Sequence, residues 1–262
     1  MGFPLSLLGG LYRAMAFSWT SFWRGAASTA FLVLCWHLVS LIVDREIIFP
    51  GPKTVGVAMG EIVAREDFWP TVGASLWRIG LSFALAFSLA FILGVLAGRY
   101  QVAAELLAPL IQLVRSVPTV AIILLVMLWL RSNRAPILVG ALIAFPVLYF
   151  NVVEGMRSVD EKLLEMAKAY RLGKWRVFKS LYLPSLKSFL GAGAISAMGI
   201  TIKMVIAAEV FSQPKQGIGT RFQAARIALD TPALFGWALL VVGFSWVIDA
   251  IMKKVQSLSQ TG

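Results

Sequence analysis

The sequence predicts an all-α membrane protein with about six transmembrane helices. Of its 262 residues, 59% are hydrophobic and 14% are charged, and the mean hydropathy is +0.81. A soluble globular domain carries roughly 25% charged residues, so this composition excludes that class. Long apolar runs separated by short polar segments are typical of membrane-spanning helices, each of which needs about 20 apolar residues.

Six such runs place residues 26–256 in one transmembrane domain. The predicted spans cover residues 26–43, 76–97, 105–130, 137–153, 189–208 and 232–252. Pro109 and Pro118 lie inside the third run and Pro146 inside the fourth, where we expect bends. Neighbouring helices or water must satisfy the carbonyl groups that these prolines free, so both helices are predicted to line the bundle interior.

The segment before the first span, residues 1–25, is rich in aromatic side chains. No positive charge precedes its apolar run, which argues against a secretory signal. We expect an interfacial segment with its aromatic rings at headgroup depth. Between the first two spans, residues 54–64 place apolar side chains on one side, which predicts a short amphipathic helix at the outer surface.

The longest polar stretch, residues 157–187, contains eight basic and three acidic residues. Ser158 and Glu161 have the spacing of a capping box, which predicts a helix start, and Gly173 is a suitable end for that helix. A second short helix follows, with three aromatic side chains on one face: Trp175, Phe178 and Tyr182. We interpret the stretch as a rigid helix pair; the alternative is an ordinary basic loop that only orients the protein.

The basic residues predict the orientation of the chain. With both termini and this loop on one side, 13 of the 24 Lys and Arg residues lie inside and 8 outside. Cytoplasmic segments of membrane proteins carry the excess of Lys and Arg. We therefore expect both termini in the cytoplasm (N-in and C-in).

Motifs in and around this loop resemble those of permease subunits of bacterial ATP-binding-cassette importers. Glu165-Met166-Ala167, with Leu183-Pro184 downstream, is similar to their EAA loop. The nitrate, sulfonate, taurine and bicarbonate branch has similar motifs at four other places: Arg115–Pro118, Val152–Asp160, Ala208-Glu209 and Gly217-Ile218-Gly219. The likeness covers roughly residues 70–255. One position departs from it, because Arg171 stands where the EAA motif usually has glycine.

The resemblance implies a type I importer-permease fold in the bacterial cytoplasmic (inner) membrane, with a cytoplasmic coupling loop. The residues that it implies for contact with an ATPase are Glu165, Ala167, Tyr170, Arg171, Gly173, Trp175, Leu183 and Pro184. The implied partners are an ATPase dimer that binds ATP and Mg²⁺, a second permease copy, expected as a homodimer, and an external or periplasmic substrate-binding protein. The expected substrate is a small anion (nitrate, bicarbonate, a sulfonate or taurine), with a vitamin or pyrimidine precursor as the alternative.

Several residues are candidates for the translocation path or its gate: Arg115, Pro118, Lys203, Glu209, Gly217 and Gly219. Lys203 lies in the middle of the fifth span, where it either lines a path for anions or pairs with an acid of another helix or subunit. Arg115 is either a pore-lining cation or an anchor. The two glycines form either a gate hinge or a plain turn. Arg78, near the outer end of the second span, can snorkel, and no role is assigned to it.

Other classes of function find little support in the sequence. There is no G-x-x-x-x-G-K-[ST] motif, so ATP hydrolysis is expected in a partner chain, and no nucleophile, acid and base cluster indicates an enzyme. No cofactor is expected, and Cys35 and His37, each the only one of its kind, argue against a disulfide or metal site. The net charge of +11 is attributed to topology rather than to nucleic-acid binding. A secondary carrier and a non-transporting membrane scaffold are the rival functions.

Overall fold

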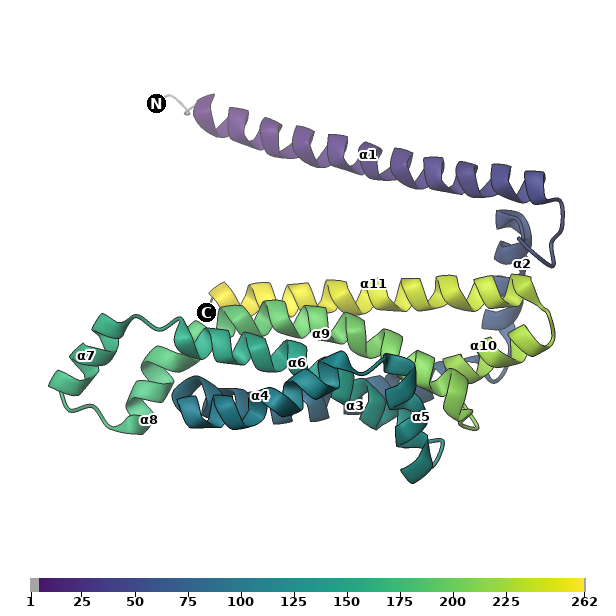
Figure 1. Ribbon diagram of the computed structural model, residues 1–262. Coiled ribbons are helices and arrows are strands. Elements are labelled where there is room, and N and C mark those ends of the chain that lie inside the picture. The colour runs from purple at the N-terminus through teal and green to yellow at the C-terminus, as the bar shows by residue number, and fades with distance from the viewer. Residues whose placement is uncertain (1–4, 262) are drawn as a thin grey trace.

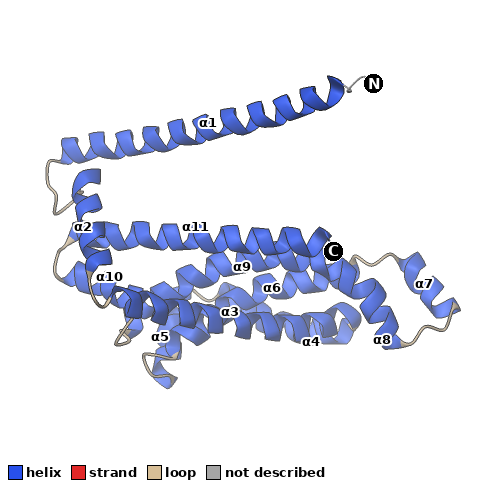
Figure 2. Ribbon diagram, turned by 180° about the vertical axis from the view of Figure 1, so that it is seen from behind, coloured by secondary structure: helices blue, strands red, loops and turns tan. Residues whose placement is uncertain are grey.

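The computed structural model of the chain describes residues 5–261, with side chains described for residues 23–258 (Figure 1). All regular structure in this range is helical (Figure 2). The first half contains α1 (Leu5–Val43), α2 (Pro52–Ala64), α3 (Phe68–Arg99), α4 (Gln101–Ser116), α5 (Thr119–Trp129) and α6 (Ala135–Arg157). The second half contains α7 (Glu161–Ala169), α8 (Lys174–Val177), a π-helical turn (Phe178–Tyr182), α9 (Leu183–Ser212), α10 (Ile218–Ile227) and α11 (Thr231–Thr261).

The helices confirm the prediction of about six spans. Within the described residues, five are long and apolar enough to cross a membrane: Trp23–Val43, Phe68–Arg99, Ala135–Arg157, Lys174–Ser212 and Thr231–Leu258. The bent pair of α4 and α5 is the sixth if it is counted as one span. The helix predicted at residues 54–64 is present as α2.

The predicted third span, residues 105–130, is not one bent helix. The axes of α4 and α5 differ in direction by 103°. Pro118 disfavours a helical conformation at the residue before it, and Val117 is accordingly extended (φ −74°, ψ 130°). Pro109 and Pro146, by contrast, lie inside continuous helices. The chain therefore turns sharply at one proline of the three.

Helices α3, α6 and α9 form the centre of the bundle, and α11 packs against α9 and α2 (Figure 1). Small side chains are fully buried in this centre: Ala86, Ala90, Ala144 and Ala197. Small residues let helices approach closely in lipid, where van der Waals packing holds them together. Gly140 of α6 shows how close the fit is, because a Cβ there would lie 2.7 Å from Val205 Cγ2 of α9.

Helix α1 runs apart from the bundle and approaches it near its C-terminal end (Figures 1 and 2). There Trp36 Nε1 donates a hydrogen bond to Pro50 O at 3.0 Å, and its ring stacks on Phe235 of α11 with the centroids 6.2 Å apart. The backbone of residues 5–25 is helical and continuous with the first span. The side chains of residues 1–22 lie outside the described ones, so the interfacial placement of residues 1–25 stays a prediction.

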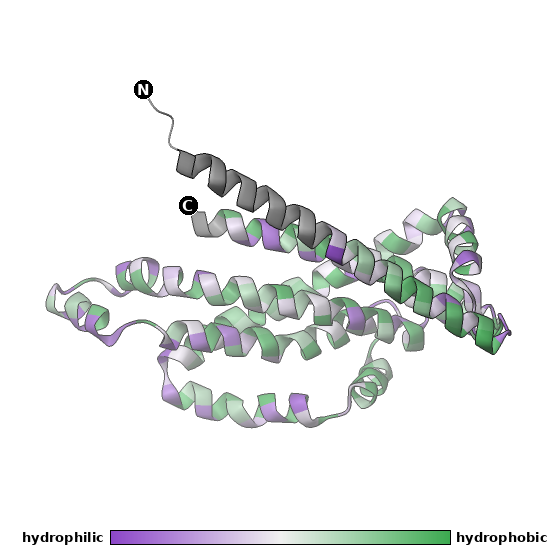
Figure 3. Ribbon diagram, turned by 90° about the horizontal axis from the view of Figure 1, so that it is seen from above, coloured by the Kyte–Doolittle hydropathy of each residue, from purple (hydrophilic) through white to green (hydrophobic). Residues whose placement is uncertain are grey.

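Apolar residues dominate the long helices, whereas hydrophilic residues gather at α7, α8 and the turns (Figure 3). Many large apolar side chains on the outer helix faces are exposed in the single chain, among them Leu34, Ile42, Leu128 and Trp246. Extended apolar surface of this kind marks contact with lipid or with another protein.

Candidate functional site

Helices α7 and α8 form the helix pair predicted between the fourth and fifth spans. Asp160 caps the start of α7, because its carboxylate accepts a hydrogen bond from Lys162 N at 2.9 Å. Ser158 Oγ instead donates to Gly155 O at 3.0 Å. The predicted capping box of Ser158 and Glu161 is therefore wrong, since Ser158 still belongs to the end of α6.

Helix α7 ends in a Schellman motif at Arg171. Arg171 adopts φ 53° and its N–H donates to Lys168 O at 3.0 Å, while Leu172 N donates to Ala167 O at 2.9 Å. Gly173, the predicted helix end, has φ −63° and precedes α8 instead, so that prediction is wrong. Arg171 itself takes the left-handed conformation that a glycine would adopt, and the turn is kept although the residue differs.

The helix pair presents a surface with large exposed side chains. Tyr170 and Trp175 are 75% and 74% exposed. Glu165 is exposed and has no ion pair with any residue that the structure describes. Ala167, in contrast, is buried. Exposed aromatic side chains and an exposed acid on the same helix pair make this surface a candidate contact for another protein.

The second helix of the loop is continuous with the fifth span. Helix α8 passes through the π-helical turn into α9, so residues 174–212 form one helix. The turn directly precedes Leu183 and Pro184, and a proline that lacks an N–H disturbs the helical hydrogen bonds at this place. The aromatic face is present as predicted, with ring centroids 6.0 and 6.4 Å apart along the row Trp175, Phe178 and Tyr182.

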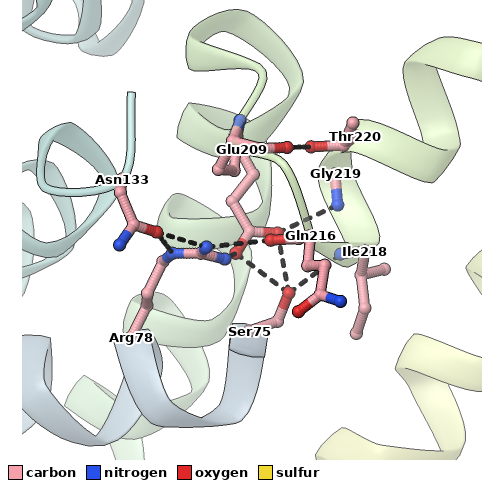
Figure 4. A network of polar contacts seen from close by, with 9 residues as sticks. Ser75, Arg78, Asn133, Glu209, Gln216, Ile218, Gly219 and Thr220 are labelled. Atoms are coloured by element: carbon pink, nitrogen blue, oxygen red, sulfur yellow. Dashed lines mark hydrogen bonds and ion pairs between the residues drawn. The ribbon is translucent and has the colours of Figure 1, made fainter. Parts of the chain in front are cut away.

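Near the other end of α9, the carboxylate of Glu209 lies in a buried polar cluster (Figure 4). Its Oε1 lies 2.6 Å from Arg78 Nη1, and Ser75 Oγ lies within 2.9 Å of both carboxylate oxygens. Gly219 N donates to its Oε2 at 3.0 Å. A buried charge is costly unless it is paired and hydrogen-bonded, and these contacts meet both conditions. The cluster thereby joins α3, α9 and α10.

The run Gly217-Ile218-Gly219 begins α10 directly against this carboxylate. Ser75 Oγ accepts a hydrogen bond from the central N–H of the run at 2.8 Å, and a helix N-terminus favours a nearby negative charge. A Cβ on the last glycine would overlap Ile206 O, and one on the first would lie 2.8 Å from Glu209 Oε2. The run is therefore a closely packed junction: a side chain on the last glycine would overlap the α9 backbone, and one on the first would displace the Glu209 carboxylate.

Arg78 is the charged member of this cluster that sequence reasoning missed. Its side chain does not snorkel: the residue is 5% exposed. The guanidinium donates to Asn133 Oδ1, at 3.1 Å from Nε and 2.6 Å from Nη2, and to Gln216 O at 2.8 Å. It thus ties the α5–α6 turn and the α9–α10 turn to α3. A signal was available in the sequence, because an arginine and a glutamate within two spans are expected to seek partners.

The remaining candidates for the path lie elsewhere on the chain. Lys203 projects from another face of α9, is exposed, and has no ion pair with any described residue. The guanidinium of Arg115 lies 5.2 Å from the centroid of the Phe150 ring, and Pro118 is exposed at the α4–α5 break. Among the described residues, no group of three or more His, Cys, Asp or Glu could hold a metal ion.

Comparisons with known proteins identify relatives over most of the chain. SsuC of Escherichia coli (strain K12), named for aliphatic sulfonates transport, is 33% identical over 231 residues, which cover 87% of this chain and 84% of that protein. SsuC of Bacillus subtilis (strain 168) is 25% identical over 235 residues, which cover 89% of this chain and 85% of that protein. CmpB of Synechococcus elongatus, named as a bicarbonate transport system permease, is 28% identical over 153 residues, covering 58% and 55%.

Solved transporters share the fold. An inward-facing structure of the MetNI methionine transporter matches with a TM-score of 0.62 at 15% identity, covering 72% of this chain and 94% of that chain. An amino acid transporter matches with a TM-score of 0.53 at 18% identity, covering 71% of this chain and 90% of that chain. Residues 90–258 match the family described as binding-protein-dependent transport system inner membrane component. Because this match covers well over half of the chain, the protein belongs to that family, the membrane-spanning permease subunits of ATP-binding-cassette importers.

Proposed function

We propose that two copies of this permease form the translocation path of an importer for small oxoanions. An ATPase dimer that binds ATP and Mg²⁺ drives the importer, and an external substrate-binding protein delivers the anion. Both termini and the α7–α8 loop lie in the cytoplasm, because the larger share of Lys and Arg is on that side.

The continuity of α8 with α9 is the observation that carries the coupling mechanism. Residues 174–212 form one helix, so a partner that binds the surface around Tyr170 and Trp175 would move α9 as a lever. Helix α9 carries both Lys203 and Glu209. ATP binding in the partner would therefore shift the population between outward-open and inward-open states of the path.

Two observations support an anionic substrate. The relatives described above are named for sulfonates and bicarbonate. In addition, Lys203, which has no ion pair with any described residue, places a positive charge on an exposed face of α9, beside Ser196 and Gly199. An uncompensated cation within the membrane attracts anions more strongly than one in water does. We place Lys203 on the path, where small neighbours leave room for a substrate and for the second copy.

Reconstitution of the complete importer in liposomes tests the substrate class. The full chain, its ATPase and its binding protein are supplied with labelled bicarbonate, nitrate, taurine and an alkanesulfonate. ATP-dependent uptake of at least one of these compounds is expected. Uptake restricted to uncharged vitamin or pyrimidine precursors would contradict the substrate class, and uptake driven by an ion gradient without ATP would indicate a secondary carrier.

Substitutions in α7 test the coupling surface. Glu165→Ala and Arg171→Glu are expected to weaken co-purification of the ATPase, or to uncouple ATP hydrolysis from uptake, while thermal stability stays close to that of the wild type. Glu66→Ala is the matched control, because Glu66 is also exposed and lies outside the loop. Normal co-purification and normal uptake in both loop variants would reject this surface as the ATPase contact.

A further inference from the structure

A cavity of about 670 Å³ lies beside the buried Arg78–Glu209 pair. Three elements form its wall: α3, the α5–α6 turn and the α9–α10 turn, at the end of the bundle away from α7 and α8 (Figure 1). The two turns contribute three cations to it: Arg131, Arg134 and Lys215. None of the described residues that line the cavity is Asp or Glu.

The positive charge of this cavity is not compensated within the described part of the chain. Arg78 also lines it but is paired with Glu209. Arg131, Arg134 and Lys215 are exposed and have no ion pair with any described residue. Like charges that share a cavity repel one another, and low-dielectric walls strengthen the field that they create. A bound anion would relieve this repulsion, so the cavity selects a negative ligand.

The buried pair also fixes the two turns that carry the cations. Arg78 donates to Asn133 Oδ1 between the two arginines of one turn, and to Gln216 O next to the lysine of the other. Because the amide oxygen of Asn133 faces Arg78, its NH₂ group points away from Arg78 and offers two further donors (Figure 4). Donors and cations that are held in place before binding lose little conformational freedom when a ligand arrives.

We propose that this cavity is the outer capture site of the importer, where Arg131, Arg134 and Lys215 hold one small oxoanion before it enters the membrane path. The proposal rests on the function inferred above. A volume of about 670 Å³ lies within the roughly 300–1,000 Å³ typical of small-ligand pockets. Nitrate, bicarbonate or a short alkanesulfonate, with some of its hydration water, therefore fits.

Fluorescence quenching tests the capture site directly, since Trp77 lines the cavity and is 68% exposed. The full chain with its ATPase is placed in phosphatidylcholine nanodiscs without binding protein, and quenching by iodide, an anion, is compared with quenching by neutral acrylamide. The signal of Trp77 is the difference from Trp77→Phe. We expect iodide to quench Trp77 efficiently. Methanesulfonate is expected to protect Trp77 from iodide when chloride salt is used to keep the ionic strength constant.

A triple variant gives the decisive comparison. In Arg131→Gln/Arg134→Gln/Lys215→Gln, the affinity for methanesulfonate is expected to fall roughly tenfold or more, the scale of one lost charge-assisted hydrogen bond, while acrylamide quenching stays unchanged. The control Arg45→Gln/Lys53→Gln/Arg226→Gln removes the same charge from exposed residues that do not line the cavity. Equal losses in the two triple variants would overturn the proposal, because general surface charge would then explain the binding.

Two other sources of negative charge give different results. If methanesulfonate does not change the iodide quenching of Trp77 but anionic lipid does, the cations bind lipid phosphate and the proposal fails. If the triple variant of the cavity changes only the concentration of binding protein that half-saturates ATP hydrolysis, the cations contact an acidic surface of the binding protein. The proposal fails in that case too. The quenching assay requires no transport. An importer that moves no anion at all would therefore refute the proposed function separately from the capture site.

Discussion

Arg78 Nη1 lies 2.6 Å from Glu209 Oε1, and the two residues are 131 positions apart in the sequence. Glu209 is fully buried and Arg78 is 5% exposed. Their contact joins α3 to α9, and hydrogen bonds to Gly219 and Asn133 extend it to the start of α10 and to the α5–α6 turn. A single ion pair thereby fixes the segments that surround the outer cavity.

Removal of one partner from this pair is expected to cost more stability than removal of both. Arg78→Met leaves the Glu209 carboxylate buried without a counter-charge, and the expected loss is about 3–5 kcal/mol. Arg78→Met/Glu209→Gln leaves no unpaired charge and should be more stable than Arg78→Met. Thermal unfolding of the purified full chain in detergent measures both.

An exposed ion pair provides the control for this comparison. Arg65 and Asp67 have side chains that are 56% and 34% exposed, so Arg65→Met should cost no more than about 1 kcal/mol. If Arg78→Met/Glu209→Gln lost as much stability as Arg78→Met and a single Glu209→Gln variant added together, the residues would contribute independently and the pair would not be the stabilising unit.

Arg171→Gly is expected to stabilise the end of α7. A non-glycine residue in the left-handed region costs roughly 1–2 kcal/mol, and the greater freedom of glycine in the unfolded chain offsets about 0.5–1 kcal/mol of that gain. The expected net gain is about 0.5–1 kcal/mol. Slower hydrogen exchange of the Leu172 amide, which donates to Ala167 O, would report it. Arg171→Val should speed this exchange, because a β-branched residue tolerates φ 53° poorly. Unchanged hydrogen exchange of the Leu172 amide in both variants would show that the backbone of Arg171 is not strained.

The features predicted correctly from the sequence depend on local pattern. Apolar run length located the spans, and the charge content of residues 157–187 located the helix pair. The capping residue of α7 was missed because Ser158 and Asp160 both have suitable side chains, and the choice depends on where α6 ends. The turn at Pro118 was expected as a bend, but its angle depends on the packing of α4 and α5.

Local pattern did not identify the partner of Glu209. Sequence spacing relates Glu209 only to residues of its own helix, such as Lys203. Its partner in the structure, Arg78, comes from α3, and hydrophobic periodicity does not show which faces of two distant helices meet. Glu209 and the two glycines were recognised as noteworthy through the family resemblance, whereas Ser75 and Asn133 had no distinguishing sequence signal.

The ion pairs of Asp67 are expected to make stability depend on pH. A hydrogen bond from Arg65 and the charge of Arg221 lower the pKa of the Asp67 carboxyl below its ordinary value of 3.8. A carboxyl whose pKa is lowered by folding stabilises the fold fully at pH values above its ordinary pKa. This stabilisation is lost as the pH falls through the lowered pKa of the folded state. Asp67→Asn should therefore lower Tm at about pH 6, and its Tm difference from the wild type should shrink as the pH falls below 3.8.

Melting curves over this pH range provide the measurement, with Glu66→Gln as the control at a neighbouring exposed acid that has no ion pair in the described part of the chain. A Tm difference between Asp67→Asn and the wild type that stays constant down to the lowest pH would show that the carboxylate charge is not the stabilising feature.

Variants of Lys203 show whether this residue lines the path or is a structural charge. The side chain has no ion pair with any described residue, so Lys203→Gln should change the stability of the isolated chain by about 0.5 kcal/mol at most. Anion uptake should fall roughly tenfold, which corresponds to about 1.4 kcal/mol of lost attraction. Lys203→Arg keeps the charge and should retain most of the uptake, whereas Lys53→Gln, at an exposed residue of α2, should leave uptake unchanged. If Lys203→Gln prevented two copies from associating and Lys203→Arg restored association, the lysine would instead pair with an acid of the second copy, and the anion path would have to follow another face of α9.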